Sequence, residues 1–179
     1  DHLLILGPSG CGKTTLLNLM SGLLKLTQGE IMFENKSYAN LSNENIDNLR
    51  ALHFGFIFQK LHLINHLTVE QNIALAIKKP KKKLINDLLK KLDLFQNKKK
   101  LARDLSFGEA QRVAIARGVA NQPKVIFADE PTSALDDNNA KQVIDLLLSY
   151  ANRYNSTVIA STHDLRIQKF FKNTLEIKI

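Results

Sequence analysis

Residues 3–24 read LLILGPSGCGKTTLLNLMSGLL, and most of the architecture can be worked out from this stretch. Leu3 to Leu6 form an uninterrupted apolar run, which is typical of a strand that is covered on both faces. The run meets a glycine-rich turn at Gly7, and from Thr14 onward leucines recur at helical spacing. This order predicts a buried strand, a loop and a helix.

The loop has the residues that are needed to bind a phosphate chain. Gly7 to Thr14 match G-x-x-x-x-G-K-[ST] without a gap, between the expected strand and helix. Its glycines let backbone amides face phosphate oxygens, Lys13 can reach the β- and γ-phosphates, and Thr14 can place a hydroxyl on Mg²⁺. The positive end of the following helix favours the same anion. We therefore expect the nucleotide to contact Gly7, Pro8, Ser9, Gly10, Cys11, Gly12, Lys13, Thr14 and Thr15.

Two further apolar runs predict buried strands, VIFAD at residues 125–129 and TVIAST at residues 157–162. Neither run alternates between apolar and polar residues, and this lack of alternation is typical of strands that are covered on both faces. Between them, residues 138–154 place apolar side chains at helical spacing. A strand, a helix and a strand in this order indicate a parallel sheet in an α/β domain.

The middle of the chain, about residues 68–120, is rich in leucine, lysine, asparagine and alanine, and nothing in it is typical of a strand. Thr68 and Gln71 form a capping-box pattern at the start of a helix, and Pro80 separates this helix from the next, at residues 85–95. We expect a mostly helical insertion into the sheet domain.

A pair of acidic residues follows the second apolar run. Asp129 ends the run and Glu130 comes next, the arrangement expected for a magnesium-binding aspartate beside a carboxylate that faces the γ-phosphate. Asp129 would bind the metal, and Glu130 would act as the general base on the attacking water. Acidic residues at a strand end are also common as helix caps, so the pair alone does not indicate a metal site. Its combination with the phosphate loop does.

Composition narrows the possible functions. The 179 residues suffice for one domain, 1–179, and the longest apolar run, residues 73–77, is too short to span a bilayer. The net charge of +8 favours anionic partners. Ten of the 25 basic residues lie in the segment 78–100, which is either a solvated face or a contact with a partner or membrane.

Five motifs in order resemble the ATP-binding-cassette (ABC) ATPases. Residues 105–109, LSFGE, followed by AQRVAIARG, are similar to the family's signature, which is usually LSGGQ. The phosphate loop precedes it, and Gln59 in FGFIFQ resembles the Q-loop. Residues 133–136, SALD, resemble the D-loop, and His163 in STHD resembles the switch histidine. The resemblance covers about residues 3–165.

The resemblance implies an α/β P-loop NTPase core with a parallel sheet, into which a mostly helical signature subdomain is inserted. It implies ATP and Mg²⁺ as cofactors, with Thr14, Gln59 and Asp129 at the metal and Glu130, His163 and Gln59 as the catalytic set. It also implies a head-to-tail dimer of two copies, in which Ser106 and Gly108 of one copy close over the ATP held by Lys13 of the other. The position of Ser106 and Gly108 is consistent with this, because the free amides at the start of a helix favour an anion.

Three departures from the family pattern affect these expectations. Phe107 replaces a small residue, and Glu109 replaces glutamine and adds a negative charge near the position of a γ-phosphate. The strand of the phosphate loop begins almost at Asp1, so we expect the family's N-terminal strands and adenine-stacking aromatic to be missing from this chain.

The resulting hypothesis is the cytoplasmic ATP-hydrolysing subunit of a membrane transporter, peripheral on the inner face of the cell membrane and bound to integral membrane subunits. FGFIFQ, LTVEQNIALA and FADEPTSALD look most like the branch that serves lipoprotein release, macrolide export and cell division. The alternatives are a non-transport ABC ATPase that acts on nucleic acid or ribosomes, and a P-loop small-molecule kinase. Ser106 follows Lys13 by only 93 positions, which leaves no room for the long coiled coil of the chromosome-tethering relatives, so we expect no specific nucleic acid partner.

Overall fold

The structure, a computed structural model, describes residues 1–133 and 135–178. Its core is a sheet of five strands in the order β4-β5-β6-β1-β7, and every pair of neighbours is parallel. The strands are β1 (Leu3–Leu6), β4 (Phe54–Ile57), β5 (Val125–Asp129), β6 (Thr157–Thr162) and β7 (Asn173–Glu176). A separate antiparallel pair consists of β2 (Met32–Phe33) and β3 (Lys36–Ser37). The expected parallel α/β sheet is confirmed.

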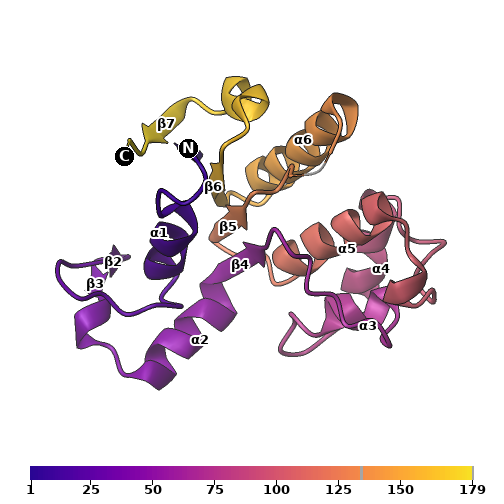
Figure 1. The fold of residues 1–179 in the computed structure, drawn as a ribbon. Helices are drawn as coiled ribbons and strands as arrows, with labels where there is room; N and C mark the ends of the chain where they lie inside the picture. The colour runs from indigo at the N-terminus through magenta and orange to yellow at the C-terminus, as the bar shows by residue number, and fades with distance from the viewer. Residues whose placement is uncertain (134, 179) are drawn as a thin grey trace.

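Helices cover both faces of this sheet. The α-helices are α1 (Lys13–Met20), α2 (Asn43–His53), α3 (Val69–Ala74), α4 (Lys82–Lys91), α5 (Phe107–Val119) and α6 (Asp137–Arg153). Short 3-10 helices are η1 (Tyr38–Asn40), η2 (Ala102–Asp104) and η3 (Leu165–Phe170). Figure 1 shows α1 and α2 on one side of β4 and the group α3, α4 and α5 on the other.

Alternation along the strands divides the apolar side chains between two cores. Leu4 and Leu6 belong to the larger core, together with residues of α3, α4, α5 and α6, whereas Ile5 belongs to a smaller core with Leu17 of α1. Successive side chains of a strand point to opposite faces, so the apolar run 3–6 supplies both cores at once. This explains why the strand sequences show no polar alternation.

The insertion between β4 and β5 is helical, as expected from residues 68–120. Thr68 accepts a hydrogen bond from the amide of Gln71 (3.3 Å), and the Gln71 side chain accepts one from the amide of Thr68 (2.9 Å), so the predicted capping box is present. In this stretch the described residues make one isolated bridge, between Thr68 and Leu101. No helix within residues 1–133 or 135–178 combines the length and apolarity that crossing a membrane requires.

Several element boundaries differ from the sequence-based expectation. The helix after the phosphate loop ends at Met20 and not near residue 24, because Gly22 takes a positive φ of 69° and the chain turns. The helix expected at 85–95 spans Lys82–Lys91 instead, and the chain reverses at Asp93 with φ 54°. Strand β4 and the edge strand β7 were not expected, since β4 contains a glycine and the residues of β7 are exposed.

Candidate active site

The carboxyl ends of four parallel strands lie at the same edge of the sheet and carry the candidate residues. Strand β1 leads into the phosphate loop, β5 ends at Asp129, β6 ends just before His163, and β4 ends two residues before Gln59. Ligands of open parallel sheets bind outside this edge. Pairing of the strands in parallel therefore gathers residues that are far apart in the sequence.

The phosphate loop has the backbone that its glycines predict. Gly10 and Gly12 have positive φ values of 84° and 97°, a backbone conformation that residues with a side chain rarely adopt. Lys13 is only 6% exposed, and its ammonium donates to the carbonyls of Gly7 (2.8 Å) and Pro8 (3.0 Å). The remaining loop residues lie at the surface or are half-buried: Ser9, Cys11, Thr14 and Thr15.

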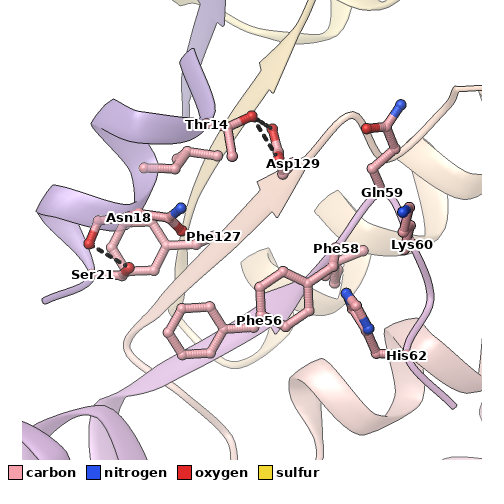
Figure 2. A pocket seen from close by; sticks show the side chains of 12 residues that line it. Thr14, Asn18, Ser21, Phe56, Phe58, Gln59, Lys60, His62, Phe127 and Asp129 are labelled. Atoms are coloured by element: carbon pink, nitrogen blue, oxygen red, sulfur yellow. Dashed lines mark hydrogen bonds between the residues drawn. The ribbon is translucent and has the colours of Figure 1, made fainter. Parts of the chain in front are cut away.

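Asp129 is hydrogen-bonded to Thr14 at the start of α1 and to Ser161 of β6. The hydroxyl of Thr14 donates to both of its carboxylate oxygens, at 2.8 and 3.1 Å, as Figure 2 shows. The hydroxyl of Ser161 donates to Oδ1 at 2.5 Å. Ser161 lies beside Asp129 in the parallel register of β5 and β6. The phosphate loop, β5 and β6 thus share one carboxylate.

Glu130 is buried, at 8% exposed, and its backbone has a positive φ of 48°. Such a conformation is strained for a residue with a side chain and is often found at functional sites. Its amide donates to the carbonyl of Ser161 (2.8 Å), which holds the turn. The carboxylate accepts from the hydroxyl of Thr162 (2.8 Å), and Oε1 lies 2.9 Å from Nδ1 of His163. This geometry resembles that of a general base held by an orienting histidine.

Gln59 lines a cavity of about 230 Å³ between α1, β4 and β5, together with Thr14 and Asp129. Figure 2 places Gln59 on the segment after β4, across the cavity from the Thr14–Asp129 pair. Phe56 and Phe58 stack with their centroids 5.6 Å apart and form the apolar part of its lining. Gln59 therefore lies at the same edge of the sheet as Thr14 and Asp129. Its exposed side-chain amide faces them across this cavity.

Ser106 and Gly108 lie in a different part of the molecule. Both are exposed at the start of α5, and Figure 1 shows α5 on the opposite side of β4 from α1. Ser106 caps α5 by accepting from the amide of Glu109 (3.3 Å). The structure does not bring this helix start to the phosphate loop of the same chain.

The segment after β5 and the segment after β6 are connected by Arg166. Its guanidinium donates twice to Asp164, both at 2.8 Å, and once to the carbonyl of Leu135 (3.3 Å), and it pairs with Asp137 at the start of α6. The guanidinium lowers the pKa of Asp164. Ala134, in the expected D-loop, lies outside the described residues.

Three residues of this site are not predicted from the sequence motifs, namely Ser161, Thr162 and Arg166. A usable signal exists for Ser161, because a parallel pairing of the two predicted strands places it beside Asp129. Thr162 is the next residue along the same strand. Arg166 lies three residues beyond His163, and no motif marks it. Its role depends on contacts with Asp137 and Leu135, about 30 positions earlier.

Comparisons with known proteins identify the family of the chain. Residues 1–133 match the family model described as ABC transporter. The lipoprotein-releasing system ATP-binding protein LolD of Buchnera aphidicola subsp. Schizaphis graminum is 43% identical over 99% of this chain and 80% of its own. The macrolide export ATP-binding/permease protein MacB of Pasteurella multocida is 37% identical over 97% of this chain and 28% of its own.

Solved structures of ABC cassettes have a similar fold. A dimeric structure of the ABC transporter cassette MJ0796 has a TM-score of 0.88 and 32% identity, and the match covers 99% of this chain and 81% of that one. The same cassette, in a dimeric post-hydrolysis state bound to ADP and Pi, matches with the same score, identity and coverage. The chain therefore belongs to the ABC transporter family, as an ATP-binding and ATP-hydrolysing subunit.

Proposed function

We propose that this chain binds the ATP triphosphate at residues 7–15 and hydrolyses it with Glu130 as the general base. One observation carries the proposal: Nζ of Lys13, in the phosphate loop, lies 3.7 Å from Oε1 of Glu130. A lysine that reaches the terminal phosphates therefore adjoins the carboxylate that would activate the water. His163 and Thr162 would hold the carboxylate in place through the two contacts described above.

The oxygen ligands at the edge of the sheet fit Mg²⁺. Thr14 offers a hydroxyl and Asp129 a carboxylate, and Gln59 lines the same cavity with an amide. Within the ranges 1–133 and 135–178, no three carboxylate, imidazole or thiol groups form a cluster for a metal. A magnesium ion commonly takes one or two protein ligands and completes its shell with water and phosphate oxygens, and the Thr14 hydroxyl and Asp129 carboxylate would serve as those ligands. The ion would neutralise charge on the phosphates.

A second copy would complete the site. Ser106 and Gly108 present the exposed start of α5, where amides without helical partners favour an anion, but this start lies away from Lys13 of its own chain. In a head-to-tail dimer, Ser106 and Gly108 of one copy would close over the triphosphate on Lys13 of the other. Dimers are known for the similar cassette MJ0796.

Integral membrane subunits would bind in a groove of about 830 Å³ between α2, β4 and α5. Its rim carries exposed apolar side chains, Leu52 at 52% and Leu75 at 58%, which a partner would cover. Arg117 in the groove donates to the carbonyls of Leu61 (2.7 Å) and His62 (2.5 Å), in the segment that follows Gln59. Movement of that segment with nucleotide would therefore change the groove.

The relatives support a proposal for the class of transporter. We place the membrane partners with those of the lipoprotein-releasing system, because LolD is 43% identical over almost the whole chain. The chain would then lie peripherally on the cytoplasmic face of the membrane. Copurification of this chain with such subunits, and loss of copurification in Leu52→Asp, tests the assignment. Lys141→Ala, an exposed change on α6, is the control.

Mixing two inactive variants tests the composite site. Lys13→Ala removes the phosphate lysine, Ser106→Arg blocks the signature end, and we expect each variant alone to lose ATP hydrolysis. A mixed dimer has one intact site if Lys13 and Ser106 act across the interface, so the mixture should recover measurable phosphate release. A mixture that stays inactive, with both variants still folded, would contradict the head-to-tail site.

A further inference from the structure

The carboxylate of Glu109 turns back onto the start of α5. Its Oε2 accepts from the amide of Ser106 (2.7 Å), while the amide of Glu109 donates to the hydroxyl of Ser106 (3.3 Å). These two bonds form a reciprocal capping box. A glutamine in place of Glu109 could make the same box, so capping does not explain a negative charge here.

The segment before η2 supplies two more donors to the same carboxylate. Nζ of Lys100 lies 3.1 Å from Oε2, and the side-chain amide of Asn97 donates to Oε1. The Ser106 amide and then the Lys100 ammonium lower the pKa of Glu109 to about 2. The carboxylate is therefore ionised at neutral pH and needs a compensating charge.

The position of Lys100 is fixed by its backbone. Its carbonyl accepts from the amide of Val69 (3.0 Å) at the start of α3, and its amide donates to the carbonyl of Asn97 (2.8 Å). The Lys100 side chain is 38% exposed and that of Glu109 is 20% exposed, so water screens the pair only in part. The neighbouring Lys99 pairs instead with Glu70 of α3 and is 73% exposed.

We propose that Lys100 is a positioning residue for the signature end of α5: it neutralises Glu109 and holds its carboxylate on the cap, so that the exposed amides near Ser106 and Gly108 can meet a triphosphate. This inference rests on the proposed head-to-tail dimer, in which that triphosphate belongs to the second copy. Without Lys100, the carboxylate would repel an anion that carries several negative charges. Lys100 is required only because residue 109 is a glutamate.

The proposal makes the effect of Lys100 conditional on Glu109. In a Glu130→Gln background, which should keep ATP bound, we expect Lys100→Met to raise the ATP concentration for half-maximal dimerisation about 10-fold, equivalent to about 1.4 kcal/mol. Lys100→Met combined with Glu109→Gln should return to within about 2-fold of the background, because the repelling charge is gone. Lys100→Arg keeps the charge and should dimerise like the background. Lys99→Met is the matched control and should also dimerise normally.

Analytical ultracentrifugation over a range of ATP concentrations measures these effects, and repetition at about 0.5 M salt adds a second readout. Screening should shrink the defect of Lys100→Met, whereas a lost structural brace would persist. A defect that Glu109→Gln fails to rescue, or no defect at all, would overturn the role of Lys100. A background protein that never dimerises with ATP would instead refute the proposed dimer, and this inference with it.

Discussion

The ammonium of Lys13 and the carboxylate of Glu130 lie 3.7 Å apart, and their side chains are only 6% and 10% exposed. Two opposite charges in so little water compensate one another, and each would be costly to bury alone. A triphosphate in the loop would compete with Glu130 for the same ammonium. Binding of the substrate would thereby leave the Glu130 carboxylate to His163 and Thr162.

Glu130→Gln should separate ATP binding from hydrolysis. The amide keeps the shape of the side chain but cannot take a proton, so turnover should fall by about 100-fold or more. Binding of ATP, measured by equilibrium dialysis, should persist, and gel filtration with ATP should show a trapped dimer. Near-normal phosphate release would exclude Glu130 as the base.

Thr162→Val should impair catalysis more than ATP affinity. The buried hydroxyl donates to Glu130 (2.8 Å) and accepts from the amide of Asp164 (3.0 Å), and valine replaces it with a methyl of similar size. We expect kcat to fall about 10-fold and the KM for ATP to change little, since a loss of about 1.4 kcal/mol in orientation corresponds to a factor of ten. Thr157→Val, at the start of β6, is the control. An unchanged kcat would show that His163 alone orients Glu130.

Arg166→Ala should loosen the connection between the segments after β5 and β6. It leaves Asp164, whose side chain is 12% exposed, without its main partner. We expect the free energy of unfolding to fall by about 1–3 kcal/mol and ATP-dependent dimerisation to weaken. Urea unfolding and ultracentrifugation measure the two effects. Retention of both properties would mean that Thr132 alone, which donates to Asp164 at 3.2 Å, is sufficient.

Acid should remove the contribution of Glu109 to the free energy of unfolding. Its folded-state pKa of about 2 lies below the value near 4.3 of an unfolded glutamate, so the folded state binds this proton less readily. The stabilisation is complete above about pH 4.3 and is lost as the pH falls toward 2. Urea unfolding at pH 7 and pH 3 should thus give a smaller acid-induced loss of stability for Glu109→Gln than for the unmodified chain. Equal losses would indicate that this carboxylate has an ordinary pKa in the folded chain.

Nucleic acid should leave ATP hydrolysis unchanged. The lysines of residues 78–100 can attract phosphates, but a solvated basic face gives only weak and salt-sensitive DNA binding. We expect no change in the rate of phosphate release when duplex DNA or RNA is added at about 150 mM salt. Strong stimulation would favour a non-transport ABC ATPase over a transporter subunit.

The local part of the site is encoded directly in the sequence. A phosphate loop works through backbone turns and a following helix, which neighbouring residues specify, so residues 7–15 predict a triphosphate site without knowledge of the fold. The same is true of the capping box at Thr68 and of the apolar runs that became β1, β5 and β6. Strand β4 could not be recognised this way, because its four residues FGFI include a glycine and pair with β5, which lies far along the chain.

Relationships across the sheet and between its loops were decided only by the tertiary structure. The parallel register places Ser161 beside Asp129, and the turn after β5 brings Glu130 to Thr162 and His163. From the sequence, the charge of Glu109 is expected to disfavour a nearby phosphate. In the structure this charge is paired with that of Lys100, nine positions earlier in the chain. Such pairings depend on how segments pack in space, and contact energies between distant residues leave no local pattern in the chain.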